Sequence, residues 1–334
     1  MTVIPSRENA GMEMNLSTLA KHFSDEAAAW ELVEKMRWPD GPVCPHCGDR
    51  NRAYFLKPRN GTRTTSTGRV SYRRLWKCKA CRRQFSVLVG TIFERSQVPL
   101  SKWLLATYLM GASKNGVAAN ELRRTLGVTQ PTAWFMLHRL RESMRHAPLD
   151  VMKGTIVADE TWIGGDPHNR HGRDKPERIL PGENLHTDKQ PVLSLINADT
   201  GEVRSRVVPD ITGATLRKVI SENVDMAGSV LHTDEGGWYR QLGREFIEHN
   251  AVNHSAGEYV RGNVSTNRAE GYFSQLKRSI DGTHHHVSVE HLHRYLAEHD
   301  FRYSTCKMTD TARMQRIIDQ AEGRRLTYRR VTAA

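Results

Sequence analysis

Four of the five cysteines form two short pairs, and this pattern constrains the fold more than any other feature of the sequence. The pairs are Cys44–Cys47 and Cys78–Cys81, and 30 residues separate them. Two thiolates spaced in this way can reach one tetrahedral Zn²⁺ from a single tight turn. The gap exceeds the usual spacing, but strand-like runs at 52–57 and 70–78 flank a basic tip at 59–69. The sequence therefore predicts a small β zinc ribbon over residues 40–93, with one structural Zn²⁺ bound by all four thiolates.

The remaining features of this region fit the same prediction. An apolar run at 85–93 is predicted to add a third strand. His46 lies inside the first pair, but four thiolates already complete a structural site, so we interpret His46 as a bystander. Cys306 stands apart and is predicted to be a buried thiol. A redox CxxC motif or unrelated free cysteines are the alternatives.

The chain is strongly basic, and the charge is uneven. Of 334 residues, 49 are Lys or Arg and 37 are Asp or Glu, which gives a net charge of +12 and favours a polyanionic partner such as nucleic acid. Residues 51–83 carry eleven Lys or Arg and no acid. A solvated basic face is the alternative explanation for this run. Its candidates for phosphate contacts are Arg73, Arg74, Lys77, Arg82 and Arg83.

Hydropathy bears on the compartment. No apolar run approaches the ~18 residues of a membrane helix, and the first 20 residues lack the apolar stretch of a signal peptide. We therefore expect a cytoplasmic protein without a membrane partner, associated with the nucleoid when bound to DNA. The length predicts two or three domains.

A helical region separates the ribbon from the second half of the chain. Residues 1–39 are predicted to be a helical segment, and residues 97–146 a helix-turn-helix-like module that binds DNA. Within the module, helices at 118–126 and 130–143 flank a short turn that contains Gly127. The second helix offers Gln130, Thr132 and Arg139 to bases or phosphates. An ordinary helical hairpin with a basic face would have the same pattern.

From residue 152 to 305 the pattern changes to an α/β domain with a mixed sheet. Strand-like runs at 155–158, 191–196 and 203–208 precede an amphipathic helix at 214–224 and a strand at 229–232. Three strands, a helix and a further strand resemble the RNase H-like order. Residues 164–190 are interpreted as a loop-like insertion, and residues 306–334 as a basic C-terminal tail.

Three carboxylates stand at positions suited to metal-dependent chemistry. Asp159 and Asp234 lie at or near the ends of predicted strands, where a sheet can bring them together. Glu270 and Lys277 are seven residues apart and share one face of a predicted helix. Cleavage of a phosphodiester by two divalent ions needs about three carboxylates. Turn chemistry, an exposed strand edge and a capping box that pairs Asn267 with Glu270 are the alternatives.

Two tryptophans and a cluster of histidines are predicted to have no role in metal binding. Trp162 and Trp238 follow the two aspartates and are predicted to pack in the core. The cluster at 284–286, with His291 and His293, is predicted to pack or to contact phosphate rather than to bind a second metal.

The motifs together resemble the DDE transposases of bacterial insertion sequences, in particular the ISXO-like group with an N-terminal zinc ribbon. The resemblance covers roughly residues 25–305. It rests on the ribbon and on six segments: 159–165, 232–234, 266–271, 276–278, 282–288 and 291–295.

The resemblance implies an enzyme that depends on Mg²⁺ or Mn²⁺. Such an enzyme would bind the inverted repeats of its own element as double-stranded DNA, cleave there and join the 3′-hydroxyls to target DNA, acting as a homo-oligomer in the synaptic complex. It implies Asp159, Asp234 and Glu270 as the magnesium ligands, Lys277 as the accompanying cation, and Asn267 as the alternative third-position residue. The competing functions are a catalytically inactive zinc-ribbon regulator that binds DNA and a simple RNase H-like nuclease.

Overall fold

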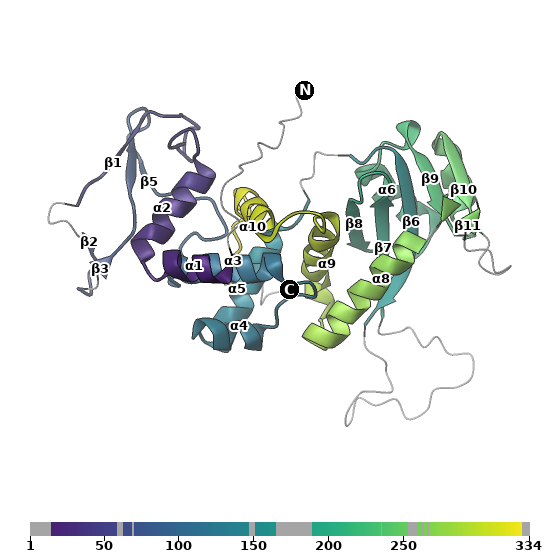
Figure 1. Ribbon diagram of the computed structural model, residues 1–334. Helices are drawn as coiled ribbons and strands as arrows, with labels where there is room; N and C mark the ends of the chain where they lie inside the picture. The colour runs from purple at the N-terminus through teal and green to yellow at the C-terminus, as the bar shows by residue number, and fades with distance from the viewer. Residues whose placement is uncertain are drawn as a thin grey trace. The chain divides into compact units, whose positions relative to one another are not determined.

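The protein forms two compact units in the computed structural model (Figure 1). The first unit spans Met1–Ala112 and Lys307–Arg325, and the second spans Ser113–Cys306 and Leu326–Ala334. The described residues are 15–58, 63–68, 70–146, 151–164, 189–234, 236–252, 260–261, 264–265 and 267–328. The division after Ala112 falls inside the predicted module at 97–146, so that module is not a unit of its own. The predicted insertion at 164–190 lies almost entirely outside the described residues.

The first unit begins with two helices and a small antiparallel sheet. Helices α1 (Leu16–Phe23) and α2 (Glu26–Arg37) start at caps made by Asn15 and Asp25. The sheet has the order β1-β4-β5, with strands Ala53–Phe55, Trp76–Cys78 and Gln84–Phe85. A separate hairpin pairs β2 (Arg63–Thr64) with β3 (Val70–Ser71).

The third ribbon strand is shorter than predicted. The run at 85–93 contributes only its first residue to β5, and turns follow it. Within these turns Gly90 has φ +77°, which lies outside the β region, so no strand runs through the segment. The apolar side chains Val87, Ile92 and Phe93 are nevertheless fully buried. The sequence pattern identified burial correctly and the backbone conformation wrongly.

Helix α10 (Asp310–Asp319) completes the first unit and corrects the prediction of a basic tail at 306–334. Its residues Met314, Ile317 and Ile318 are fully buried and follow the helical spacing of an apolar face. They pack against α3 (Leu100–Ala112), where a Cβ added to Gly111 would lie 3.5 Å from the backbone nitrogen of Met314. The C-terminal segment therefore supplies part of this unit's core.

The second unit is built on a five-stranded mixed sheet with the order β10-β9-β6-β7-β8. Strands β6, β7 and β8 form an antiparallel meander, whereas β9 runs parallel to β6, and β10 runs parallel to β9. Helix α6 (Gly213–Asn223) connects β8 to β9. The strands are Thr155–Ile163 (β6), Gln190–Asn197 (β7), Val203–Val207 (β8), Val230–Thr233 (β9) and Glu248–Ala251 (β10).

Alternation along β6 assigns its side chains to two cores. Ile156 and Ala158 pack with residues of α6 and α7 (Tyr239–Leu242), whereas Val157 packs with residues of α8 (Asn267–Ser279). Figure 1 shows α8 along one face of the sheet. A five-residue π-helix (Ile280–His284) follows α8, and a separate hairpin pairs β11 (Val260–Arg261) with β12 (Val264–Ser265). Successive residues of β6 therefore face opposite layers.

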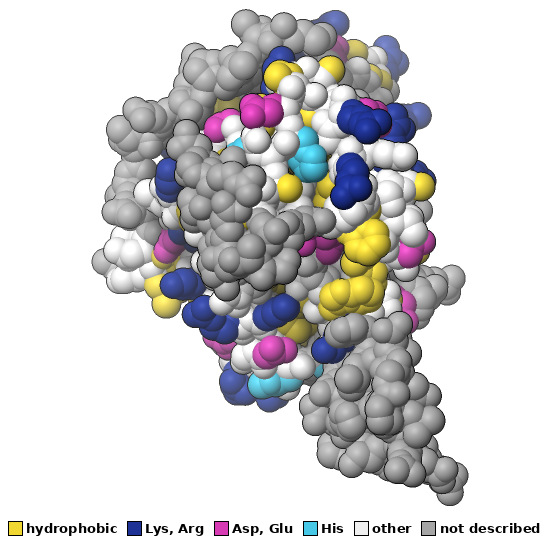
Figure 2. Space-filling view, turned by 90° about the vertical axis from the view of Figure 1, so that its right-hand side faces the viewer, with side chains coloured by type: hydrophobic (Ala, Val, Ile, Leu, Met, Phe, Trp, Pro, Cys, Tyr) yellow, Lys and Arg dark blue, Asp and Glu magenta, His cyan; other side chains and the backbone are white. Residues whose placement is uncertain are grey.

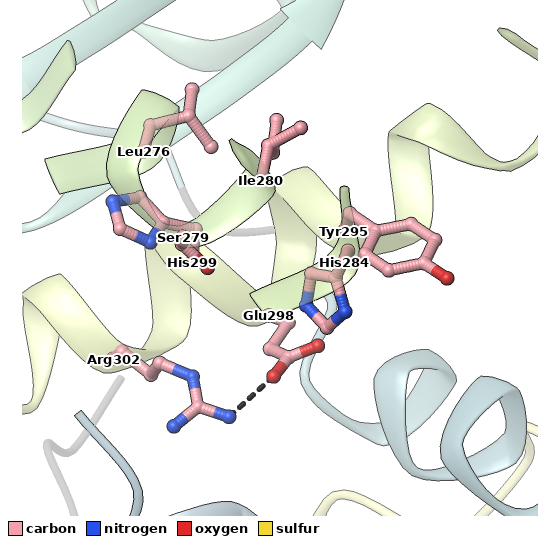
Figure 3. Close-up of a pocket in the computed structure, with 8 residues that line it drawn as sticks. All are labelled: Leu276, Ser279, Ile280, His284, Tyr295, Glu298, His299 and Arg302. Carbon is pink, nitrogen blue, oxygen red and sulfur yellow. Dashed lines mark hydrogen bonds and ion pairs between the residues drawn. The ribbon is translucent and has the colours of Figure 1, made fainter. Parts of the chain in front are cut away.

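The predicted helix-turn-helix segment packs into the second unit through buried ion pairs. Its helices α4 (Ala119–Leu126) and α5 (Gln130–Ser143) pack against each other, and α5 also packs beside α9 (Val289–Ser304). Arg141 of α5 donates to Glu298 of α9 over 2.6 Å, and Arg302 also pairs with Glu298 (Figure 3). A second pair joins Arg294 to Glu142 at 2.7 Å. Most of α5 therefore faces the interior of the unit.

The cavity beside Glu298 is too small for a ligand. It measures about 10 Å³, the space of roughly one water molecule. Its lining includes His284, and burial lowers the pKa of His284 to about 4, so this side chain is neutral at pH 7. The cluster is structural in character. Among the described residues, no helix has the length and apolar character needed to cross a membrane.

Candidate functional site

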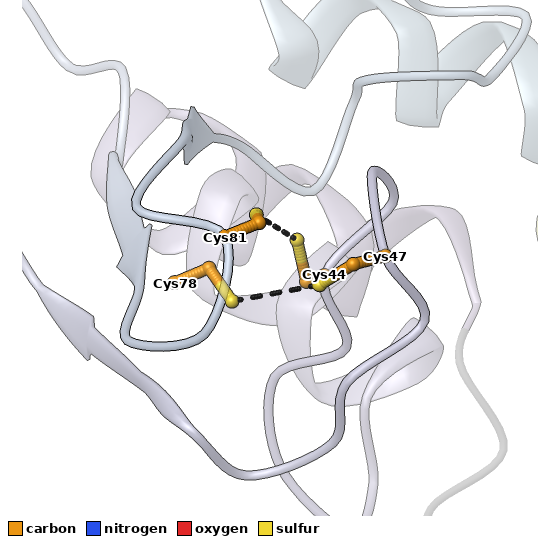
Figure 4. A group of neighbouring side chains, drawn as sticks. All are labelled: Cys44, Cys47, Cys78 and Cys81. Atoms are coloured by element: carbon orange, nitrogen blue, oxygen red, sulfur yellow. Dashed lines mark hydrogen bonds between the residues drawn. The ribbon is translucent and has the colours of Figure 1, made fainter.

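The four paired cysteines meet in the first unit (Figure 4). Their sulfur atoms all lie within 4.8 Å of one another, with 3.6 Å between the Sγ atoms of Cys44 and Cys81 and 3.7 Å between those of Cys47 and Cys78. A regular tetrahedron with Zn–S bonds of about 2.3 Å separates its sulfurs by about 3.8 Å. The donor set and spacing therefore fit one zinc ion, as the sequence predicts.

The residues around the four cysteines make other contacts. A ring nitrogen of His46 lies 3.3 Å from the carbonyl oxygen of Gln84, which agrees with its interpretation as a bystander. Each cysteine pair lies on a tight turn: the Gly48 N–H donates to the Cys44 carbonyl at 2.9 Å, and the Cys78 N–H donates to the Arg83 carbonyl at 3.0 Å. Cys306 is exposed, so the prediction that it is a buried thiol is wrong.

Three of the ribbon's five predicted phosphate-binding side chains lie exposed. These are Arg73, Arg82 and Arg83, while Lys77 is half-buried. Tyr54 and Tyr72 are also exposed and lie among the basic residues in sequence. Exposed cations interleaved with aromatic rings are typical of a nucleic-acid surface.

Arg74 is a correction to this set. Its guanidinium donates to Glu34 at 2.8 Å and to Glu31 at 2.9 Å, and it lies 4.7 Å above the ring of Phe55. These contacts connect the ribbon to α2. The positive charge of Arg74, which the sequence analysis assigns to phosphate binding, is therefore paired with two acids of the protein itself. The acids lie 40 and 43 residues away, outside the acid-free run.

Arg139 is a second correction. Only 3% of its surface is exposed, because it lies on the part of α5 that faces the interior. Gln130, at the start of α5, is exposed, and the Thr132 hydroxyl lies 2.8 Å from that of Thr129 at the N-cap. Only the first turn of α5 therefore offers polar side chains to a ligand.

The parallel pairing of β6 and β9 brings the two aspartates to equivalent places. The described pairing ends with Val157 opposite His232, and Asp159 and Asp234 stand two residues further along their chains. Adjacent strands are about 5 Å apart. Asp159 Oδ1 accepts a hydrogen bond from the Glu160 N–H at 2.8 Å, and Asp234 Oδ1 accepts one from the Gly236 N–H at 3.0 Å. Local backbone contacts thus orient both carboxylates.

Glu160 is a third carboxylate at this place, and the sequence interpretation did not single it out. Its carboxylate accepts a hydrogen bond from the hydroxyl of Tyr239, a fully buried residue. The pKa of Glu160 is raised to about 7, and burial of its carboxyl group is the largest cause. The hydrogen bond from Tyr239 acts in the opposite direction, whereas the charges of Asp159 and Asp234 also raise this pKa. The effect of both aspartates on Glu160 indicates that Glu160 lies near them. The adjacent Asp-Glu in the sequence was the available signal.

Helix α8 carries the remaining predicted residues. Ala269, Tyr272, Phe273 and Leu276 are buried against the sheet, while Glu270 and Lys277 lie on the exposed side. The helix begins at Asn267, so this residue stands in the first turn instead of preceding it. Asp159 shares the β6 face of Val157, which α8 covers.

The three predicted magnesium ligands are not drawn together as tightly as the cysteines. Within the described part of the chain, only the four cysteines form a group of at least three ligand side chains whose donor atoms all lie within 4.8 Å of one another. Asp159 lies in the middle of β6, Asp234 directly follows the adjacent strand β9, and Glu270 lies on a neighbouring helix. The three acids thus lie on neighbouring elements. Their carboxylate oxygens are farther apart than the sulfur atoms of the four cysteines.

The two tryptophans beside the aspartates are a further correction. Trp162 is 38% exposed and Trp238 is 49% exposed, so neither is the core residue that the sequence predicted. Figure 2 shows hydrophobic side chains, in yellow, exposed on the face that it presents. Exposed indole rings therefore follow both aspartates in the sequence.

Comparison with known proteins agrees with both halves of the chain. The family described as "ISXO2-like transposase domain" matches residues 151–304, and the family described as "Transposase zinc-ribbon domain" matches residues 24–84. An "Uncharacterized protein in transposable element ISH50" from Halobacterium salinarum is 27% identical over 307 residues, which cover 90% of this chain and 98% of that protein. The thiolate ribbon lies in the segment that matches the transposase zinc-ribbon domain, and the carboxylate-bearing sheet lies in the segment that matches the ISXO2-like transposase domain, so the chain combines these two transposase domains in that order.

Proposed function

We propose that this transposase binds the terminal inverted repeats of its insertion sequence, hydrolyses the DNA ends with divalent metal ions and joins the freed 3′-hydroxyls to target DNA. The observation that carries the proposal is the parallel pairing of β6 with β9, which brings Asp159 in the middle of β6 level with Asp234 directly after β9, inside the matched transposase domain. The order of the five strands supports an RNase H-like catalytic domain.

Asp159, Asp234 and Glu270 would hold Mg²⁺ or Mn²⁺, and Asn267 is the alternative third residue. Oxygen donors of this kind suit both ions, which when bound supply Lewis-acid activation of a phosphodiester. Glu270 is favoured over Asn267 because a third negative charge balances two divalent ions better than an amide does. Lys277, two turns along the same exposed side of α8, would position a phosphate of the bound DNA.

The chemistry consists of two displacements at phosphorus. In the first, a water oxygen bonds to the phosphorus at the element end, and the bond to the 3′-oxygen breaks to leave a 3′-hydroxyl. In the second, this hydroxyl oxygen bonds to a phosphorus of the target, and the target's own 3′-oxygen leaves. The carboxylates hold the reacting groups in place, so both displacements use one set of side chains.

The ribbon would supply most of the affinity for the element ends. Arg73, Arg82 and Arg83 are exposed for phosphate contacts, with Lys77 beside them and Gln130 at the start of α5. Thr132 has a smaller share in this proposal because its hydroxyl contacts the helix cap. A synaptic complex would hold two DNA ends, so we expect a homo-oligomer bound to double-stranded DNA in the cytoplasm.

The test is a strand-transfer assay on a duplex with the terminal repeat, taken from the DNA that flanks the coding sequence. We expect the full chain to nick and join this duplex only with Mg²⁺ or Mn²⁺, and Asp159→Asn to lose about 10³-fold of both activities, since bound metal contributes several kcal/mol. Glu222→Gln, which changes an exposed acid of α6, is the matched control. Binding without nicking would identify an inactive regulator, and nicking without joining a simple nuclease.

A further inference from the structure

Asp300 is a fully buried carboxylate that the proposed chemistry does not use. It lies on α9 and is 1% exposed. Its pKa is raised to about 6, with burial as the largest cause, whereas hydrogen bonds from Tyr272 and Ser205 and the charge of Arg206 act in the opposite direction. The carboxyl group is therefore largely ionised at pH 7. Within the described part of the chain, its hydrogen-bond partners are hydroxyl and N–H groups, and it forms no ion pair.

Both carboxylate oxygens of Asp300 contact β8, the edge strand of the sheet. The Ser205 N–H donates to Oδ2 at 2.7 Å, and the Ser205 hydroxyl donates to Oδ1 at 2.7 Å. The hydroxyl of Ser194 on β7 lies 2.9 Å from that of Ser205. Further along α9, the Ser304 hydroxyl accepts a hydrogen bond from the Val203 N–H at 2.9 Å. Helix α9 thus supplies acceptors to N–H groups of β8.

The same carboxylate also holds α8. The Tyr272 hydroxyl donates to Oδ1 of Asp300 at 2.6 Å and lies 2.8 Å from the Ser205 hydroxyl. Tyr272 is fully buried, and the centroid of its ring lies 5.0 Å from that of His299 and 5.3 Å from that of Tyr303, both on α9. One buried hydroxyl therefore connects α8 to α9 and to the edge of the sheet.

This connection lies close to Glu270 along α8. Tyr272 follows Glu270 by two residues, which is about 3 Å along the helix axis and about 200° around it. Tyr272 is buried, whereas Glu270 lies on the exposed side of the helix. Apolar packing is non-directional, but a hydrogen bond to a fixed carboxylate has a preferred geometry. Fixing the hydroxyl of Tyr272 therefore fixes the rotation and the axial position of α8, and with them the place of Glu270.

We propose that Asp300 is a positioning residue that, through Tyr272, sets the place of Glu270 at the proposed metal site. This inference rests on the proposed function, because Glu270 is a metal ligand only within that proposal. An ionised carboxylate is costly to bury, and an apolar side chain of similar volume would pack there at a lower cost in free energy. The hydrogen bonds that Asp300 accepts specify one register of α8 against the sheet, which apolar packing alone does not.

The experiment measures Mn²⁺ binding to the full-length protein from the electron paramagnetic resonance signal of the free ion, without chelator so that zinc is retained. We expect Tyr272→Phe, which removes only the hydroxyl, to weaken Mn²⁺ binding about tenfold, as the loss of side chains that orient metal ligands does. Asp300→Asn should act in the same direction. Melting temperatures identify the variants that fold, and where Asp300→Asn does not fold, Tyr272→Phe decides.

Ser304→Ala is the matched control. It also removes an acceptor on α9 from an N–H group of β8, but the hydrogen bond that it removes does not involve α8. We expect this variant to bind Mn²⁺ like the wild type.

A double-mutant cycle separates positioning from a general loss of stability. Glu270→Gln should itself weaken Mn²⁺ binding. In that background Tyr272→Phe should have little further effect, because the hydroxyl acts through Glu270. A general loss of stability would weaken Mn²⁺ binding equally in both backgrounds.

Three outcomes would overturn this inference alone, provided that the wild type binds Mn²⁺ and nicks the terminal-repeat duplex. In the first, well-folded Tyr272→Phe binds Mn²⁺ like the wild type. In the second, Ser304→Ala weakens binding as much as Tyr272→Phe does. In the third, the effects of Tyr272→Phe and Glu270→Gln add. A wild type that binds no Mn²⁺ would refute the proposed function, and this inference with it.

Discussion

Gly236 lies where any side chain would disturb the surface between Asp234 and Trp238. An added Cβ would lie 2.7 Å from Nε1 of the indole and 3.1 Å from Oδ1 of Asp234, whereas one added to the neighbouring Gly237 would meet nothing within 4 Å. The two adjacent glycines therefore differ sharply in what a methyl group would do. This contrast gives a test of the local geometry.

We expect Gly236→Ala to lower Mg²⁺-dependent nicking by about 10²-fold, because displacement of a reacting group by about 1 Å has an effect of this size. Gly237→Ala should nick at nearly the wild-type rate. Nicking rates on the terminal-repeat duplex and melting temperatures of both variants provide the measurement. Equal rates for the two variants would show that the Asp234 surface tolerates the shift.

At the scale of single residues, the sequence predicted chemical type better than environment. Apolar runs predict both aspartates at or near strand ends, but only Asp234 directly follows its strand, whereas β6 continues for four residues beyond Asp159. Arg74 and Arg139 were assigned to phosphate, but one pairs with two acids of α2 and the other is buried. Both outcomes depend on contacts between segments far apart in the chain, which charge and local periodicity do not specify.

Helices α4 and α5 show the same distinction at the scale of elements. Their bounds were predicted to within a residue, because Gly127 in the left-handed conformation ends one helix and Thr129 caps the next. Burial of α5 was not predicted, since its partner Glu298 lies 157 residues away. Strand β10 was missed because its four residues, Glu248–Ala251, lack the apolar pattern of a buried strand.

The ion pairs between α5 and α9 lead to a stability prediction. Glu298 is 3% exposed and contacts both Arg141 and Arg302. We expect Glu298→Gln to lower the free energy of unfolding by about 3–5 kcal/mol, because two buried guanidinium groups lose their counter-charge. Denaturant unfolding measures the change. Glu290→Gln, at an exposed position of the same helix, should leave the stability of the protein close to that of the wild type.

The pH dependence of this effect has a definite sign. Burial alone would raise the pKa of Glu298, but the charges of Arg141 and Arg302 outweigh it and hold the pKa well below its usual range. The stabilisation is therefore present above the unfolded pKa of about 4.3 and is lost as the pH falls toward the lower folded pKa. The stability difference between wild type and Glu298→Gln should shrink below pH 4. A difference that grew on acidification would contradict the assignment.

At the scale of the whole molecule, the basic surface of the ribbon predicts how DNA affinity responds to salt. Each neutralised phosphate contributes about −0.9 to the slope of log K against log salt on duplex DNA. We expect the triple variant Arg73→Gln, Arg82→Gln, Arg83→Gln to bind the terminal repeat more weakly and with a slope smaller in magnitude by about 2–3. Titrations at several salt concentrations measure this slope.

An equal loss of charge elsewhere in the first unit provides the control. Lys35, Lys307 and Arg316 are exposed residues of that unit outside the ribbon. Changing these three to Gln should leave the slope nearly unchanged. Equal slopes for the two triple variants would mean that total charge, and not the ribbon, determines affinity.

The position of α10 also sets the order in which the protein can mature on the ribosome. The first unit takes its last helix from Lys307–Arg325, and all 194 residues from Ser113 to Cys306 are synthesised before that segment. At about 5–20 residues per second, this interval lasts about 10–40 s. During this time the N-terminal half lacks the side chains that complete its core. A nascent chain therefore contains the whole sheet of the second unit before the core of its first unit is complete.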